Sequence, residues 1–112
     1  MFTRANTNHY TQVLPGIQLK TLTYGKKTLF TEFRLTKGKV LPKHSHPHEQ
    51  TGYLVSGAIR LTIGAETFDV KPGDCWCIEG NVEHGAEILA GTVAIEVFSP
   101  VRSDYVPMYV AE

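Results

Sequence analysis

The stretch that decides the interpretation of this chain is Gly38-Lys-Val-Leu-Pro42-Lys-His44-Ser-His46-Pro-His48-Glu49-Gln50. It contains three of the chain's five histidines, and these three lie within five consecutive positions, 44–48. Because alternate side chains of an extended strand share one face, we expect His44 and His46 to point the same way. Neutral imidazole suits Zn, Ni, Cu, Mn and Fe, so this pair forms half of a candidate metal site.

A further candidate, His84, lies in a second loop, which Gly80 and Asn81 open. Two loops that each carry a histidine favour a metal site. The alternative is a surface loop that happens to be rich in histidine.

The bulk composition narrows the classes of partner. Eleven basic and eleven acidic residues balance, so no basic excess is present to drive binding to nucleic acid or to an anionic membrane. No stretch approaches the ~18 apolar residues of a membrane span, and the N-terminus lacks the apolar region of a signal peptide. We therefore expect a soluble, cytoplasmic protein with a small-molecule ligand.

The pattern of glycine, proline and alternating apolar residues predicts an all-β protein. Ten glycines and six prolines punctuate the chain, and no long helix is indicated. After an irregular start (1–15), the expected strands are 17–24, 28–36, 50–56, 58–63, 66–70, 75–78, 87–89 and 92–99. About eight to ten short strands indicate a sandwich or barrel. We expect one domain (1–112), with a core barrel over about 17–99.

Local patterns give two expectations about burial. On the strand 66–70, Phe68 and Val70 are the expected inward pair. Cys75 and Cys77 flank Trp76, and residues two apart on one strand rarely form a disulfide. We expect both cysteines to be buried or half-buried free thiols.

The tail, residues 100–112, is apolar and aromatic, with Tyr105, Met108 and Tyr109. An exposed tail of this kind would promote association. We expect it to pack on its own barrel or on a second subunit, and we expect a homodimer.

Two motifs give the chain a specific resemblance to the cupin superfamily, whose members are small jelly-roll (double-stranded β-helix) barrels. The first cupin motif is matched by Gly38, His44, His46 and Gly57, with Gln50 in the position of its Glu. In the second motif Gly73 and His84 match, whereas Glu79 stands for its Pro and Asn81 for its Gly.

The resemblance implies that His44, His46, Gln50 and His84 converge inside the barrel on one divalent ion. Ni, Zn, Mn, Fe and Co all suit this set. Four uncharged ligands leave the full charge on the ion, which favours Lewis-acid chemistry over iron redox chemistry. By alternation Glu49 faces away from Gln50, although an irregular loop would let it reach the ion. His48 is more typical of a rim position than of a fifth ligand.

Two stretches resemble a narrower group, the pectin-degradation cupins that open the ring of 4,5-unsaturated uronates. One is the run 44–50. The other lies on and after the last strand, where Glu96 stands for the group's Asp, Phe98 and Arg102 match, and Ser99 stands for Thr.

The resemblance implies catalytic roles for Glu96 and Arg102, with Phe98 and Arg102 contacting the substrate. A bound metal would lower the pKa of a ring hydroxyl, Glu96 would take its proton, and Arg102 would hold the uronate carboxylate. The alternatives are a solvent-facing Glu96 and a surface ion pair between Arg102 and Asp104. Because Glu is one bond longer than Asp, the carboxylate moves by roughly 1.5 Å, and such a displacement can cost ~100-fold in rate.

Two other functions remain open from the sequence. The first is another metal-dependent cupin enzyme, such as a dioxygenase, a small-molecule lyase or an isomerase. The second is a non-catalytic cupin that binds a small ligand. Iron-dependent oxygen consumption would indicate the first of these. A pocket without metal would indicate the second.

Overall fold

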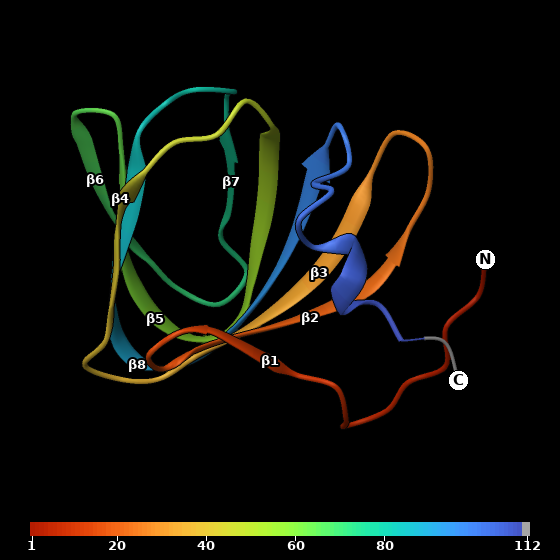
Figure 1. Ribbon diagram of the computed structural model, residues 1–112. Coiled ribbons are helices and arrows are strands. Elements are labelled where there is room, and N and C mark those ends of the chain that lie inside the picture. Colours follow the sequence, from red (N-terminus) through yellow and green to blue (C-terminus); the bar gives the residue numbers. More distant parts are fainter. Residues whose placement is uncertain (111–112) are drawn as a thin grey trace.

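The computed structural model describes residues 1–110 as one curved antiparallel sheet (Figure 1). Its strands are β1 (Thr11–Leu14), β2 (Ile17–Tyr24), β3 (Leu29–Leu35), β4 (Val40–His44), β5 (Glu49–Ile63), β6 (Glu66–Val70), β7 (Cys75–Ile78) and β8 (His84–Ser99). A 3₁₀ turn, η1 (Val106–Met108), follows. No helical segment within residues 1–110 is long and apolar enough to cross a membrane.

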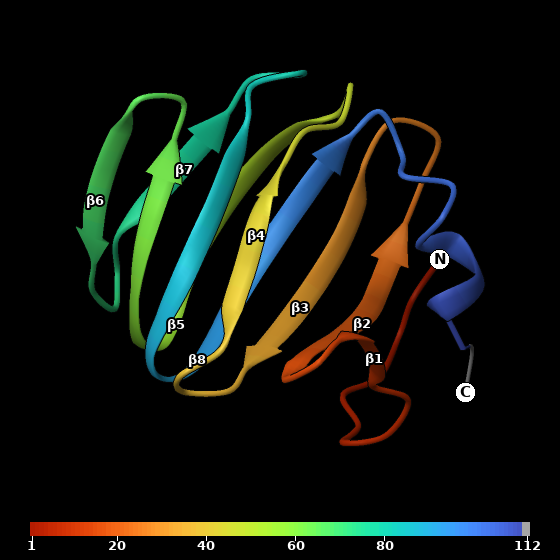
Figure 2. The same cartoon turned by 60° about the vertical axis from the view of Figure 1, so that its left-hand side comes forward.

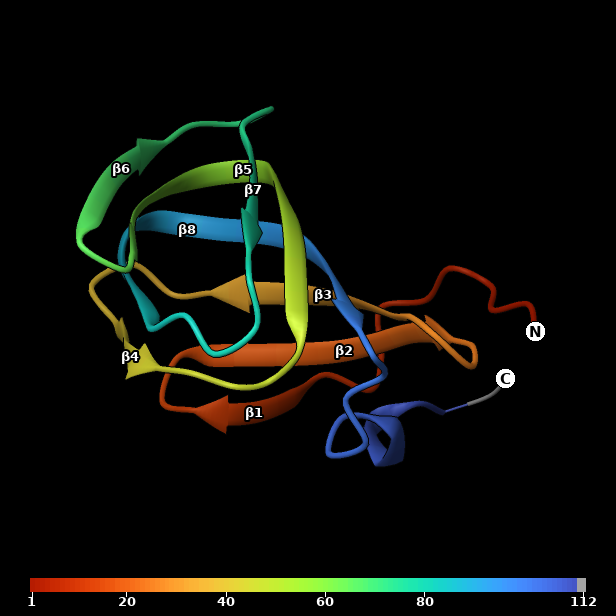
Figure 3. The same ribbon diagram turned by 90° about the horizontal axis from the view of Figure 1, so that it is seen from above.

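Two long strands, β5 and β8, take part in both walls of the barrel. They pair with each other along most of their length. The first half of β5 also pairs with β7 and its second half with β6. Similarly, β8 pairs first with β4 and then with β3 (Figure 2). This sharing curls the sheet into a jelly-roll barrel (Figure 3), which confirms the predicted all-β fold.

The bends of β5 and β8 pack against each other and close one end of the barrel, at the bottom of Figure 1. Gly57 adopts φ 96°, and the register of β5 shifts on either side of it. A Cβ at Gly57 would lie 2.3 Å from Thr92 Oγ1 and 2.4 Å from Gly91 O. The prediction of separate strands on either side of Gly57 and Gly91 is wrong, because β5 and β8 each run through these glycines as one continuous strand, which Gly57 bends in β5.

Inward-facing side chains of β2, β3, β5 and β8 form the apolar core. On β3 the alternation is strict, with Leu29, Thr31, Phe33 and Leu35 all buried. The tail packs on this barrel through Tyr105 and Met108, and Thr21 Oγ1 donates a 2.7 Å hydrogen bond to Tyr105 O. Of the predicted tail, residues 111 and 112 lie outside the described residues.

Three local predictions differ from the structure. Phe68 is 44% exposed, whereas Val70, at the other end of the same edge strand β6, is buried as expected. Cys75 and Cys77 are free, as predicted, but exposed rather than buried. The alternation of β7 turns Trp76 toward the core and its two neighbours outward. Within the expected irregular start, residues 11–14 form β1.

Candidate metal centre and adjoining cavity

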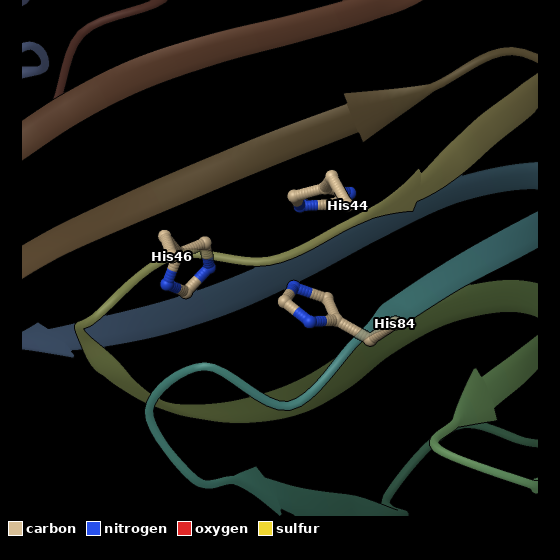
Figure 4. A group of neighbouring side chains, drawn as sticks. All are labelled: His44, His46 and His84. Carbon is tan, nitrogen blue, oxygen red and sulfur yellow. The ribbon is translucent and has the colours of Figure 1, made fainter.

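Three predicted ligands, His44, His46 and His84, gather at the open end of the barrel (Figure 4). His44 ends β4 and His84 begins β8, and the two are cross-strand partners. The ligand nitrogens of all three lie within 4.8 Å of one another. The ring centroid of His84 is 4.2 Å from that of His44 and 5.0 Å from that of His46.

Backbone carbonyls fix the orientation of each imidazole. Nδ1 of His44, His46 and His84 lies 2.8, 3.0 and 2.9 Å from the carbonyl oxygens of Pro42, His48 and Val82. A proton on each Nδ1 leaves each Nε2 as a free lone pair, which is the arrangement that metal-binding histidines adopt. Burial lowers the pKa of His46 and His84 and so favours the neutral form that a metal requires.

Two further contacts indicate that a divalent cation fits this cluster. His84 Nε2 is buried without a hydrogen-bond partner among the described residues, 1–110. His46 Nε2 lies 2.9 Å from Gln50 Oε1, so two lone pairs face each other when His46 is neutral. Two ligands at right angles, each about 2.1 Å from one ion, lie about 3 Å apart. Gln50, buried on β5, therefore joins the three imidazoles as the fourth candidate ligand.

The loop before His84 is packed against the segment that carries His46. Asn81 adopts φ 67°, a conformation that asparagine tolerates and that explains how it substitutes for the glycine of the cupin motif. Its backbone N–H donates a 2.7 Å hydrogen bond to His46 O. A Cβ at Gly80 would lie 2.5 Å from Pro47 O. This close packing holds the two histidine-bearing segments in a fixed relation.

A buried carboxyl group, Glu96, adjoins the cluster. Its Oε1 accepts hydrogen bonds from Gln50 Nε2 at 2.7 Å and from Trp76 Nε1 at 2.9 Å. Burial raises the pKa of Glu96 to about 7, against the opposing effect of these two donors and of Arg102. The sequence-based alternative of a solvent-facing Glu96 is therefore wrong.

A cavity of about 560 Å³ extends from this group. Its lining includes Pro42, His44, Gln50, Trp76, Glu96, Phe98, Arg102, Asp104 and Tyr105. Arg102 stacks over the rings of Phe98 and Tyr105, at 5.1 and 4.0 Å from their centroids. Its Nη2 also donates to Asp104 Oδ2 at 2.9 Å, so the arginine both lines the cavity and forms the alternative ion pair.

The two remaining candidates of the first motif are not members of the three-histidine group. Glu49 is exposed, as the alternation predicts. His48 is half-buried, with its ring 5.6 Å from that of His46. Sequence reasoning did not identify Trp76 or Tyr105 as residues of the site. The inward position of Trp76 on β7 was the available signal, but only the sheet register brings its indole to Glu96.

Comparison with known proteins agrees with this arrangement. A family model described as a cupin domain matches residues 31–99. The pectin degradation protein KdgF of Dickeya dadantii (strain 3937) is 32% identical over 92 residues, which cover 80% of this chain and 84% of that protein.

Solved structures give the same result. KdgF from a Halomonas species superposes with a TM-score of 0.83 at 31% identity, over 87% of this chain and 92% of that one. An RmlC-like cupin from Shewanella frigidimarina NCIMB 400 also gives 0.83, at 26% identity and 87% coverage of both chains. Family match, relatives and fold therefore agree with the resemblance to the pectin-degradation cupins, and the chain belongs to the cupin family.

Proposed function

We propose that this protein is a metal-dependent enzyme that opens the ring of 4,5-unsaturated uronate monosaccharides to give linear keto sugar acids. The observation that carries the proposal is one cavity lined by a candidate metal ligand, a buried carboxyl group and a guanidinium: Gln50, Glu96 and Arg102. Uronates are the sugar units of pectin, and two relatives of this chain carry the name of a pectin-degradation protein.

The three imidazoles and Gln50 would hold the metal. When bound, a divalent ion supplies Lewis-acid stabilisation of negative charge on a substrate oxygen. Because all four donors are neutral, none of them reduces that charge. This donor set supports proton-transfer chemistry more than iron-based oxygen chemistry.

Glu96 would act as the general base. Its carboxylate would accept the proton of the anomeric hydroxyl while the bond between C1 and the ring oxygen breaks. C1 becomes an aldehyde, and the ring oxygen leaves as an enolate, which takes up a proton and tautomerises to the ketone. A base works best when its pKa lies near the working pH, and the pKa of Glu96, raised by burial to about 7, meets that condition.

Arg102 would bind the carboxylate that every uronate carries. A guanidinium offers donors along more than one edge, and Asp104 occupies the edge formed by Nε and Nη2. The rings of Phe98 and Tyr105 support the guanidinium from beside the cavity. The remaining donors can then hold the substrate carboxylate while Glu96 acts at the other end of the ring.

Loss of enol absorbance from freshly prepared unsaturated galacturonate or guluronate tests the proposal. We expect metal-loaded protein to accelerate the loss over buffer, and EDTA or Glu96→Gln to reduce the acceleration at least ~100-fold. Glu87→Gln, an exposed position on the same strand, is the matched control and should retain activity. No acceleration with either sugar would refute the proposal. Iron-dependent oxygen uptake would instead indicate the dioxygenase alternative.

A further inference from the structure

Four residues on adjacent strands lie in one row across the barrel wall. Gly52 on β5 is the register partner of Trp76 on β7 and of Glu96 on β8. Glu96 is in turn the partner of Thr31 on β3, whose Oγ1 donates a 2.9 Å hydrogen bond to Glu96 O. The strand pairing therefore fixes the backbone of Glu96 and places Trp76 two strands away from it.

Gly52 provides the space that lets Trp76 reach across this row. A Cβ at Gly52 would lie 2.2 Å from Cε2, 2.3 Å from Nε1 and 2.4 Å from Cζ2 of the Trp76 indole. These separations are far below van der Waals contact, so the indole lies directly over the glycine. Gly52 is not among the glycines with positive φ, so the backbone there suits any residue and the lack of a side chain is what matters.

The two donors to Glu96 both bind the same oxygen. Gln50 Nε2 and Trp76 Nε1 donate to Oε1, whereas Oε2 has no hydrogen-bond partner among residues 1–110. Glu96 has one more rotatable bond than aspartate and hence more freedom to lose on becoming ordered. Two donors from different strands, β5 and β7, restrict that freedom and leave Oε2 free for another partner in a residue that lines the cavity.

We propose that Trp76, seated on Gly52, is a positioning residue that fixes the carboxyl group of Glu96 so that Oε2 presents itself to the substrate. The pair thereby restricts a side chain that has one more rotatable bond than aspartate. The catalytic part of this inference rests on the proposed function, since it takes Glu96 as the base. The positional part concerns the contact between indole and carboxyl group alone.

The first test measures the contact without activity. Trp76 is the only tryptophan, so its indole N–H gives one assignable NMR resonance. We expect Gly52→Ala to displace the indole, shift this resonance and speed its hydrogen exchange at least ~10-fold. The matched control is Gly91→Ala on β8, where a Cβ would meet nothing within 4 Å and the resonance should not move. An unchanged resonance in a folded Gly52→Ala variant would overturn the proposal.

The second test measures the consequence for turnover with a double-mutant cycle. Trp76→Phe keeps an aromatic ring but removes the N–H, and we expect it to lower kcat by ~10- to 100-fold. Metal content should not change, because the indole N–H donates to Glu96 and to none of the candidate metal ligands. KM should not change either, because Trp76 forms no hydrogen bond with Arg102, the proposed substrate-binding residue. In the Glu96→Asp background, Trp76→Phe should lower kcat less than ~3-fold. The aspartate side chain is one bond shorter, so its carboxylate lies roughly 1.5 Å away from the point where the indole N–H can donate to it.

Equal effects of Trp76→Phe in both backgrounds would refute the positioning role, as would a loss of metal that parallels the loss of kcat. The two proposals fail in different ways. Absence of turnover in the parent protein counts against the ring-opening function alone. The indole resonance of Gly52→Ala then still decides whether Gly52 and Trp76 fix the carboxyl group.

Discussion

The two ends of the barrel differ in chemistry although the same two strands line both. Near the bends, the inward partners on β5 and β8 are Leu54 with Ala94 and Ile59 with Ile88, and none is more than 3% exposed. At the open end the corresponding pairs are Gln50 with Phe98 and Ile63 with His84. Gln50 and His84 are as deeply buried as much of the apolar core.

Burial has a different energetic consequence at each end. Near the bends, the larger inward side chains, Leu54, Ile59 and Ile88, each contribute roughly 1.5–3 kcal/mol by leaving water. At the open end, a buried polar group opposes folding unless it is hydrogen-bonded. Glu96 and the Nδ1 atoms of His44, His46 and His84 have partners, but His84 Nε2 has none among residues 1–110. The closed end therefore contributes stability, and the open end carries the candidate metal site at some cost in stability.

The largest expected effect is a loss of metal affinity caused by a substitution at the open end. His84→Ala removes the buried imidazole that lacks a partner, and we expect metal affinity to fall by more than about 1,000-fold, or about 4 kcal/mol. In the parent protein, added Ni²⁺, Zn²⁺ or Mn²⁺ should raise the free energy of unfolding, since the ion binds only the folded chain. Isothermal titration calorimetry and urea denaturation measure the two quantities. Metal-dependent stabilisation of His84→Ala to the same extent as the parent would disprove the ligand assignment.

The next effect is a loss of stability, without a loss of metal affinity, caused by a substitution at the closed end. Ile88 is 3% exposed beside the bend of β8, and we expect Ile88→Ala to lower the free energy of unfolding by about 3–4 kcal/mol. The loss should be equal in EDTA and in saturating metal, because no candidate ligand lies at this end. Leu89→Ala is the matched control on the same strand, with a side chain that is 39% exposed, and should cost far less. A change in metal affinity caused by Ile88→Ala would mean that the two ends are coupled.

The apolar core was only partly predictable from the sequence. Alternation on β3 set Leu29, Phe33 and Leu35 on one face, but Phe30 on the other face left open which of the two is buried, and the structure shows that it is the first. The local breaks in that pattern were less informative. Gly57 has the same appearance in the sequence whether it ends a strand or bends one, and only the packing of Gly57 on Thr92 distinguishes the two.

At the open end, the resemblance to the cupin motifs correctly brought His44, His46 and His84 together. Alternation grouped Glu96 with Ala94 and Phe98 but left open whether that face points into the barrel or to solvent, and the structure shows that Glu96 is buried. The partners of that carboxyl group did not follow, since they depend on the register between strands that are distant in sequence. Trp76 reaches Glu96 only because a glycine occupies the intervening strand. Such a row exists only in the assembled sheet.

The smallest of the expected stability effects sharpens the comparison, because it measures what one buried polar group costs at the open end. Burial raises the pKa of Glu96 to about 7, above the ordinary value of 4.5. Between these two values Glu96 binds its proton more tightly in the folded protein than in the unfolded chain, so its contribution to the free energy of unfolding falls as the pH rises from 4.5 through 7. We expect this fall to be between about 2 and 3 kcal/mol.

Glu96→Gln isolates this contribution, because the amide oxygen can still accept hydrogen bonds from Gln50 and Trp76 but carries no titrating charge. Urea denaturation of both proteins in EDTA, from pH 4.5 to 7.5, gives two curves whose difference removes the histidines that titrate in the same range. We expect the variant to gain on the parent steadily as the pH rises, whereas Glu87→Gln, exposed on the same strand, should follow the parent throughout. Parallel curves for Glu96→Gln and the parent would mean that the buried carboxylate is fully compensated by its two donors. The open end would then hold a charge without loss of stability, and the contrast between the two ends would rest on the buried imidazole nitrogens of His84 and His48.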